Sequence, residues 1–269
     1  MEFETVLYDR EDRVGVIRLN RPSRMNAVIE QMYLDIQAVL KEAQEDESLR
    51  ALILTGSVLK RPGGEKQAFC AGADLKKHST GERSPFQKRA YILLAHETTR
   101  MIHDFLKPVI VAVNGPARGA GAEMAVNGDL LLMADTATIG FPETGLGTFV
   151  GGGVTYLLPQ IVGMMKAKEL IYTGKIVPGP EAVKLGLALQ SFPVHELMPA
   201  ALLLARKLAE KAPMSMAFAK DMVHCAPYRD FKTVLLVEAE AILACMNTKD
   251  WHEGIASFAE KREPEFTGR

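Results

Sequence analysis

The sequence has few cysteines, almost no net charge and no long hydrophobic run. Three cysteines among 269 residues are too few and too scattered for a disulfide framework, which favours a reducing compartment such as the cytoplasm. A formal net charge of −1 provides no basic patch of the kind that binds nucleic acid. No apolar run approaches the ~20 residues that a membrane-spanning helix needs. We therefore expect no signal peptide, no membrane partner and no nucleic-acid partner.

Motifs for several other chemistries are missing as well. The glycine-rich residues 145–153 lack the Gly-Lys-Ser/Thr ending of a P-loop, and no Gly-x-Ser-x-Gly nucleophile elbow is present. His96 and His103 can share a helix face, but no cluster of cysteines or carboxylates completes a metal site around them. We expect no metal, and we interpret both histidines as surface or packing residues.

Strand and helix patterns alternate through the first part of the chain. Hydrophobic residues make up 48% and charged residues 24% of the sequence, as is ordinary for a globular protein. Helices are predicted over residues 29–43, where apolar positions recur at helical spacing, and over 87–105, and residues 57–67 are predicted to form a surface loop. Continuous apolar runs predict buried strands at residues 14–20, 51–55, 108–113 and 130–134. Strands that alternate with helices indicate an α/β fold with parallel pairing.

The pattern changes after about residue 195, where strand-like runs stop. Four helix-like segments follow one another there, at residues 196–211, 215–225, 231–245 and 251–261. We therefore divide the chain into an α/β core, residues 1–195, which carries the active site, and a C-terminal helical subdomain, residues 196–269.

Two glutamates stand in apolar, glycine-rich segments. Glu123 follows Gly119-Ala-Gly-Ala, and Glu143 stands between Phe-Pro and Thr-Gly-Leu-Gly. A buried carboxylate is costly unless a partner or a reaction uses it, and two of them facing one cavity can divide acid and base roles. Two structural alternatives remain open. Glu123 can form an ion pair or a cap with Arg118 or another basic residue, and Glu143 can be a first-turn carboxylate favoured by the helix dipole.

Two short segments of small residues precede predicted helices. They are residues 71–76, Ala-Gly-Ala-Asp-Leu-Lys, and residues 119–121, Gly-Ala-Gly. Backbone N–H groups at the start of a helix lack intrahelical acceptors and can point at an anion. Either segment alone is a tight strand-to-helix turn. Together with the two glutamates they predict an oxyanion hole, in which two N–H donors hold one oxygen.

Several segments, taken together, resemble the enoyl-CoA hydratase/isomerase (crotonase) family. The similarity runs in the family's order over nearly the whole chain. Its segments are residues 20–22 (Asn-Arg-Pro), 69–75 (Phe-Cys-Ala-Gly-Ala-Asp-Leu), 107–115 (Lys-Pro-Val-Ile-Val-Ala-Val-Asn-Gly), 119–123 (Gly-Ala-Gly-Ala-Glu), 142–143 (Pro-Glu), 151–153 (Gly-Gly-Gly) and 258–262 (Phe-Ala-Glu-Lys-Arg).

This resemblance implies a fold, an assembly and a reaction. The fold is a spiral of ββα repeats with C-terminal helices that build a trimer, and often a hexamer of two trimers. The substrate is an acyl-CoA thioester, so coenzyme A is part of the substrate and not a cofactor. The reaction needs no metal or redox cofactor. The oxyanion-hole amides fall on Ala73 and Ala120, and the glycine near the catalytic water falls on Gly151. Glu123 is then the base toward water, and Glu143 the acid.

The resemblance also assigns residues to substrate binding. Those near the coenzyme are Arg24, Met25, Ala27, Ala71, Asp74, Leu75 and Lys76. Phe258 and Lys261 would reach the coenzyme of a neighbouring subunit. Gly145 stands where the family often has a bulky aliphatic residue, and Phe149 is large. These departures predict an acyl-pocket wall reshaped for a branched, cyclic or longer acyl group.

The presence of both glutamates favours a 2-enoyl-CoA hydratase, since many relatives with other activities lack one of them. Within the family, the alternatives are an enoyl-CoA isomerase that uses one glutamate and a hydratase of a cyclic dienoyl-CoA. Outside it, an RNA-binding protein is disfavoured by the near-neutral charge. A catalytically silent interaction subunit is disfavoured because both glutamates and both amide segments are present.

Overall fold

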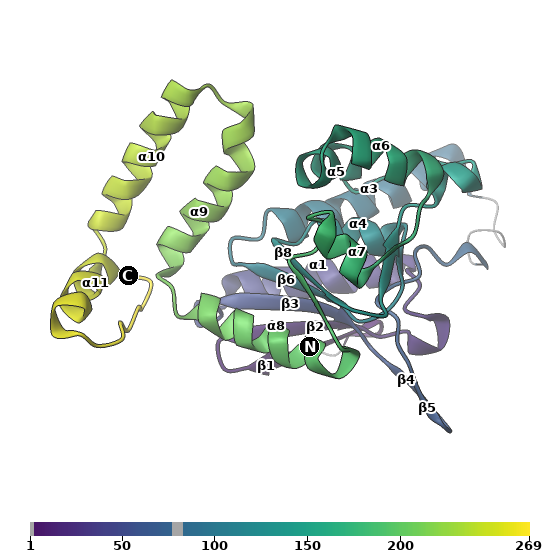
Figure 1. The fold of residues 1–269 in the computed structure, drawn as a ribbon, viewed down its shortest axis with the longest axis horizontal. Helices are drawn as coiled ribbons and strands as arrows, with labels where there is room; N and C mark the ends of the chain where they lie inside the picture. Colours follow the sequence, from purple (N-terminus) through teal and green to yellow (C-terminus); the bar gives the residue numbers. More distant parts are fainter. Residues whose placement is uncertain (1–2, 77–82) are drawn as a thin grey trace.

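A six-stranded sheet forms the centre of the molecule (Figure 1). The computed structural model describes residues 3–76 and 83–269 of the chain. In spatial order the strands are β1 (Val6–Glu11), β2 (Val14–Leu19), β3 (Ala51–Gly56), β6 (Val109–Val113), β8 (Leu130–Ala134) and β11 (Gln190–Phe192). Strand β1 pairs with β2 in antiparallel fashion, and each later neighbour pairs in parallel. The predicted α/β fold with parallel pairing is confirmed.

The apolar runs of the sequence became the inner strands of this sheet. Every residue of β3 and of β6 is buried, because helices cover the sheet and leave neither face of these strands to solvent. Strand β1 was not predicted. Asp9, Arg10 and Glu11 give it a polar sequence, and it is tolerated as an edge strand that exposes these side chains.

A second, three-stranded sheet gives the fold its spiral. It contains β7 (Ala117–Arg118), β9 (Thr138–Gly140) and β10 (Val177–Pro178) in the order β10-β9-β7. Strand β6 is followed by β7 and then by helix α4 (Ala120–Val126), while β8 is followed by β9 and the 3-10 helix η2 (Glu143–Leu146). The parallel bridges Cys70–Ala117 and Val28–Ala73 extend the small sheet toward earlier parts of the chain. Successive units therefore add one strand to each sheet.

Helices cover the sheet and define the core. Their bounds are α1 Glu30–Glu45, α3 Pro85–His103, α5 Val154–Val162, α6 Met164–Thr173, α7 Gly179–Lys184 and α8 Val194–Ala209. Helices α1 and α3 agree with the predicted ranges to within two residues at each end. A capping box fixes the start of α3, in which Ser84 accepts from the N–H of Gln87 and the Gln87 side chain accepts from the N–H of Ser84.

The predicted surface loop at residues 57–67 is a β-hairpin instead. Strands β4 (Leu59–Arg61) and β5 (Gly64–Lys66) pair in antiparallel fashion and project from the body of the molecule (Figure 1). Gly63 and Gly64 have φ values of +89° and +148°, which other residues rarely adopt, and they form the turn. The loop prediction was wrong because the strands are short and polar, so they carry no alternating hydrophobic signal.

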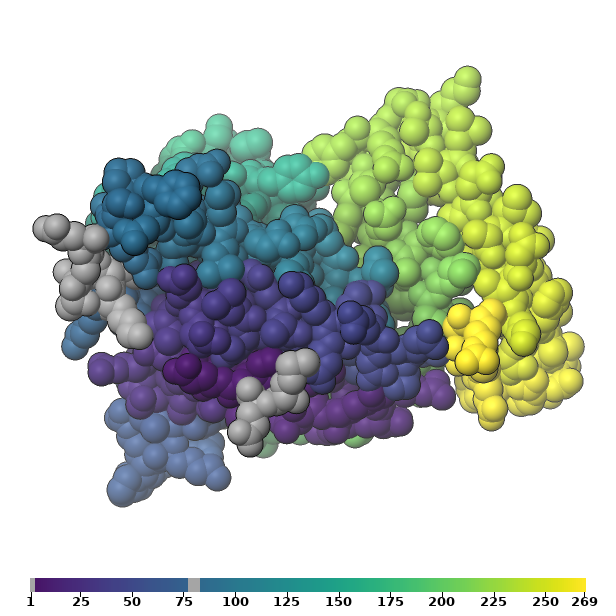
Figure 2. Space-filling model, turned by 180° about the vertical axis from the view of Figure 1, so that it is seen from behind, coloured from purple at the N-terminus to yellow at the C-terminus, as the bar shows by residue number. Residues whose placement is uncertain are grey.

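The last helices extend away from the core. Helix α8 packs against the sheet, whereas α9 (Pro213–Cys225), α10 (Phe231–Met246) and α11 (Lys249–Glu260) lie to one side of it (Figures 1 and 2). Helix α10 buries none of its residues, even though many of them are apolar. Phe231, Leu236 and Ile242 are 76%, 61% and 60% exposed. We call α9–α11 the helical arm. In the described ranges, no helix is long and apolar enough to cross a membrane.

Candidate active site

Glu123 is held inside the core by hydrogen bonds between helix α4 and the glycine-rich segment 151–153. Its side chain is only 9% exposed, and Oε1 accepts a hydrogen bond from the backbone N–H of Gly151 at 2.8 Å. The amide of Asn127 donates to the carbonyl oxygen of Glu123 at 2.7 Å and to that of Gly152 at 2.6 Å. Asn127 thus ties the helix that carries Glu123 to the glycine-rich segment 151–153.

The glycines of that segment allow the backbone to approach the glutamate. A Cβ on Gly152 would lie 2.7 Å from the Cβ of Glu123, so no larger residue fits there without a shift. Gly152 and Gly153 also have positive φ values of +59° and +77°. The close approach brings the Gly151 N–H within hydrogen-bonding distance of Glu123.

Glu143 stands at the start of η2 and is 7% exposed. A Cβ on Gly119 would lie 2.9 Å from Glu143 Oε1, so Gly119 leaves room for this carboxylate. Among the described residues, no group hydrogen-bonds to its buried Oε2. An unpartnered buried oxygen of this kind favours the protonated carboxyl.

Burial raises the pKa of both carboxyls above the usual range for glutamate. For Glu123 the hydrogen bond from Gly151 partly offsets this effect. For Glu143 a hydrogen bond from its own backbone N–H partly offsets it, and the nearby charge of Glu123 adds to it. The predicted alternative of an ion pair between Glu123 and Arg118 was wrong. Arg118 donates instead to Ala117 and to the carbonyl and hydroxyl oxygens of Thr138, at 2.7–2.8 Å.

The N–H groups of Ala73 and Ala120 are both left without a backbone acceptor in the described chain. In the parallel bridge to Val28, the carbonyl of Gly72 and the N–H of Asp74 make the hydrogen bonds, so the N–H of Ala73 points to the other side. Ala120 is the first residue of α4, and its N–H therefore has no intrahelical acceptor.

The two amide-bearing loops run side by side. A Cβ on Gly72, whose φ is +92°, would lie 2.9 Å from the carbonyl oxygen of Arg118 and 3.9 Å from the nitrogen of Ala120. Only glycine permits this approach. These loops are about 45 residues apart along the chain, and the small sheet joins them through the Cys70–Ala117 bridge.

One cavity of about 580 Å³ brings all five predicted catalytic residues together. Its walls include eight of the predicted residues, namely Ala71, Ala73, Leu75, Ala120, Glu123, Glu143, Phe149 and Gly151. Phe149 is 74% exposed and stands at the rim. Gly145 is not part of the wall among the described residues, and a Cβ there would meet nothing within 4 Å.

The remaining residues assigned to the coenzyme lie beside the cavity or far from it. Arg24, Met25 and Ala27 form a turn whose Met25 carbonyl accepts from the N–H of Ala71 at 3.0 Å, so this turn adjoins the cavity wall. Asp74 is nearly buried and forms an ion pair with Arg21 at 3.1 Å. Lys76 is exposed at the edge of the described residues.

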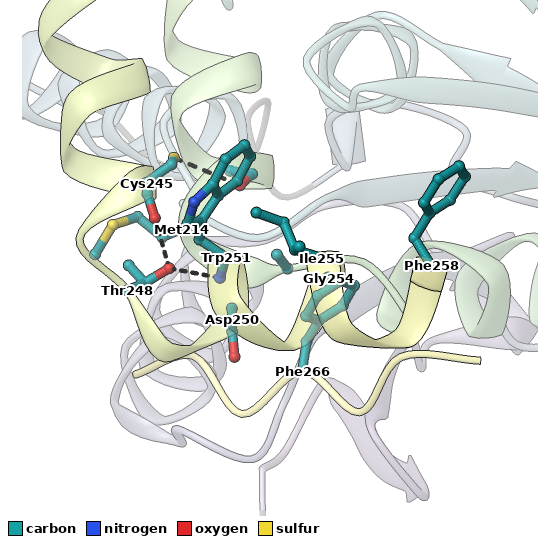
Figure 3. A pocket seen from close by; sticks show the side chains of 11 residues that line it. Met214, Cys245, Thr248, Asp250, Trp251, Gly254, Ile255, Phe258 and Phe266 are labelled. Atoms are coloured by element: carbon teal, nitrogen blue, oxygen red, sulfur yellow. Dashed lines mark hydrogen bonds between the residues drawn. The ribbon is translucent and has the colours of Figure 1, made fainter. Parts of the chain in front are cut away.

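Phe258 and Lys261 lie on the helical arm, and neither lines the catalytic cavity of its own chain in the described residues. Phe258 is 88% exposed and belongs to a separate apolar pocket of about 390 Å³ between α9, α10 and α11. Figure 3 shows Trp251, Ile255 and Phe258 along one side of α11 in this pocket. Lys261 ends α11 in a left-handed conformation with φ of +57°.

Sequence reasoning missed several side chains of the cavity wall. Tyr33 comes from α1, and Tyr91, Ile92 and His96 come from α3. His96 is exposed, as predicted, but it lines the cavity and does not lie on the outer surface. The spacing of Ile92, Ala95 and His96 along one helix face was the available signal.

Comparisons with known proteins agree on one family. The sequence model of the enoyl-CoA hydratase/isomerase family matches residues 9–269. The chain is 34% identical over 265 residues to the short-chain-enoyl-CoA hydratase of Clostridium acetobutylicum, with 98% of each chain covered. It is 33% identical over 269 residues to the crotonyl-CoA hydratase of Syntrophomonas wolfei, with 100% of each covered. The structure resembles that of an enoyl-CoA hydratase from Bacillus anthracis, with a TM-score of 0.92, 35% identity, and 99% and 100% of the two chains covered.

Proposed function

Because the chain belongs to the enoyl-CoA hydratase/isomerase family, we propose that it is a 2-enoyl-CoA hydratase. It adds water reversibly across the α,β double bond of an acyl-CoA thioester. The observation that carries this proposal is the pair Glu123 and Glu143, two nearly buried carboxyls with unequal hydrogen bonding in one cavity. An acid and a base on the same substrate are what the addition of water requires.

The thioester carbonyl binds to the N–H groups of Ala73 and Ala120. When hydroxide adds to the β-carbon, the electrons of the double bond move toward the carbonyl and form an enolate. Two fixed donors stabilise the negative charge where it develops, and they are worth more in a cavity than in water. Support comes from the two N–H groups themselves, which line the cavity and have no backbone acceptor in the described chain.

Glu123 acts as the base and Glu143 as the acid. The Gly151 N–H stabilises the carboxylate form of Glu123, which takes a proton from water as the oxygen bonds to the β-carbon. The buried, unpartnered oxygen of Glu143 favours the protonated form, which gives its proton to the α-carbon of the enolate. Proton exchange with solvent then restores both groups, and in dehydration the two roles are exchanged.

The proposal is tested by the loss of the conjugated thioester absorbance when the protein acts on crotonyl-, hexenoyl-, decenoyl- and cyclic enoyl-CoA. Glu123→Gln and Glu143→Gln should each lower kcat by roughly 10³-fold, within the range of general acid–base effects. Glu65→Gln, on the exposed hairpin, is the matched control and should retain the wild-type rate. If either Glu123→Gln or Glu143→Gln still shifts the double bond of a 3-enoyl-CoA, the protein would instead be identified as an isomerase.

We further propose that the protein assembles as a homotrimer, alone or as a hexamer of two trimers. The helical arm supports this, because its exposed apolar side chains need a partner surface. In such a trimer Phe258 and Lys261 would reach the coenzyme in a neighbouring cavity, and Arg24, Met25, Ala27, Asp74 and Lys76 would lie along the coenzyme of their own chain.

A further inference from the structure

His96 lies against the glycine that holds the catalytic base. A Cβ built on Gly151 would be 3.0 Å from Nε2 of His96, 3.3 Å from Oε1 of Glu123 and 3.5 Å from its Oε2. The imidazole and the carboxylate therefore border the same small volume above Gly151. Any side chain at position 151 would fill that volume.

The ring nitrogens of His96 make no hydrogen bond or ion pair with another protein group in the described ranges, whereas its backbone carbonyl accepts from the hydroxyl of Thr99 at 2.9 Å. His103, His195 and His224 differ, because each has a carboxylate oxygen within 3.6 Å. Helix α3 turns Ile92, Ala95 and His96 toward the cavity, and His96 is the one of these three that can donate or accept a hydrogen bond from its side chain.

The reacting water must lie next to Glu123 in the proposed hydratase. Oε1 of Glu123 already accepts from the Gly151 N–H at 2.8 Å, so this carboxylate is fixed in place and presents its remaining lone pairs to the cavity. A water has two hydrogens and two lone pairs. Deprotonation by Glu123 uses one hydrogen, and the β-carbon takes one lone pair. A second polar group is needed to fix the direction of that lone pair.

We propose that Nε2 of His96 hydrogen-bonds the water that Glu123 deprotonates, and the β-hydroxyl group in the reverse reaction. This inference rests on the proposed hydratase function. His96 contacts the reacting oxygen and neither gains nor loses a proton overall, so Glu123 and Glu143 remain the base and the acid. The histidine aligns the water with the β-carbon.

The test compares His96→Leu with His96→Gln, using crotonyl-CoA as the probe. Leucine removes the hydrogen bond, whereas the glutamine amide returns a polar group near the position of Nε2. The leucine variant should lower kcat about tenfold, the weight of one such hydrogen bond, with KM within twofold of wild type. The glutamine variant should recover at least a third of the wild-type rate. His195→Gln, at an exposed position, is the matched control and should be unchanged.

A second readout separates water alignment from general damage to the cavity. Exchange of the α-hydrogens of butyryl-CoA with D₂O requires the enolate but no added water, so His96→Leu should exchange at the wild-type rate. The inference is overturned if His96→Leu keeps the wild-type kcat, or if His96→Gln is as slow as His96→Leu. It is also overturned if the α-hydrogen exchange rate of His96→Leu falls as much as its hydration rate. A wild-type protein that does not hydrate crotonyl-CoA or longer enoyl-CoAs would overturn the proposed function itself.

Discussion

The backbone N–H of Gly151 lies 2.8 Å from Oε1 of Glu123. Glu143, the second carboxyl of the cavity, has no such donor on its buried Oε2 among the described residues. A donor stabilises the carboxylate form, and a buried oxygen without one favours the neutral acid, although the backbone N–H of Glu143 also acts on that carboxyl and lowers its pKa. Burial raises the pKa of both, so the folded protein holds their protons to a higher pH than the unfolded chain does.

The first prediction is that Glu143→Gln stabilises the protein at pH 8. Where the folded state binds more protons than the unfolded state, stability falls as pH rises. The loss begins near the ordinary glutamate value of 4.5 and is complete once pH exceeds the raised pKa of the folded protein. Glutamine carries no charge, so the variant avoids this loss of stability. We expect Tm to rise by about 2–4 °C at pH 8, or ~1 kcal/mol for a chain of this size.

Thermal unfolding at pH 5 and pH 8 checks this expectation. The gain from Glu143→Gln should shrink at pH 5, because a larger fraction of wild-type Glu143 is protonated there than at pH 8. Glu65→Gln on the hairpin should show no difference between the two conditions. A Tm for Glu143→Gln at or below the wild-type value at pH 8 would show that burial of Glu143 carries no cost.

The residues that could be predicted from sequence are those whose role depends on local backbone. Glu123, Glu143 and the small residues around Ala73 and Ala120 stood in recognisable segments, and the cavity contains all four. Two kinds of feature could not be predicted. The exposed strands β1 and β4–β5 carry polar side chains and give no period-2 signal. His96 acquires its position only when α3 packs over α4, a contact between segments far apart in the chain.

The second prediction concerns the acyl group and the rim residue Phe149. Its ring is 74% exposed at the mouth of the cavity. We expect a long acyl chain to reach and cover this ring and a four-carbon chain to fall short of it. Covering a phenylalanine contributes about 1.5–3 kcal/mol. Phe149→Ala should therefore lower kcat/KM for decenoyl-CoA about tenfold and leave crotonyl-CoA within twofold. Equal effects on the two substrates would remove Phe149 from acyl recognition.

The third prediction concerns the attachment of the helical arm to the core. Lys220 of α9 donates to Asp129 at 2.8 Å, and its side chain is only 8% exposed. Asp129 also accepts from the N–H of Val109 at the start of β6. Removing one partner of a buried pair leaves an uncompensated charge, so Lys220→Met should cost on the order of 3 kcal/mol. Urea unfolding measures this, with exposed Lys41→Met as the control that should change little.

The fourth prediction is an acid sensitivity at the same junction. The rings of His103 and His224 stack with centroids 4.2 Å apart, and Asp104, Asp129, Lys220 and Arg100 surround them. Burial lowers the pKa of His224, and His103 adds to this effect. The unfolded chain then binds more protons, so stability falls as pH drops from about 6.5 through the lowered value.

Replacing His224 should reduce that sensitivity. His224→Gln should lose less stability than wild type between pH 7 and pH 5, as followed by urea unfolding at each pH. The exposed His195→Gln variant should keep the wild-type slope, because its ring is 78% exposed and lies outside the junction. A wild-type slope in His224→Gln would place the acid sensitivity elsewhere in the protein.

The fifth prediction is that the arm assembles the protein and completes its coenzyme site. Light scattering should give a mass three or six times the 29.5 kDa of one chain. Leu236→Asp puts a charge on the apolar, 61% exposed side of α10 and should dissociate the assembly, whereas Leu189→Asp, 57% exposed outside the arm, should not. Since Lys261 would then be lost from the neighbouring coenzyme, KM for crotonyl-CoA should rise about tenfold, the weight of a charge-assisted contact. A monomeric wild-type protein, or a dissociated variant with unchanged KM, would contradict this role of the arm.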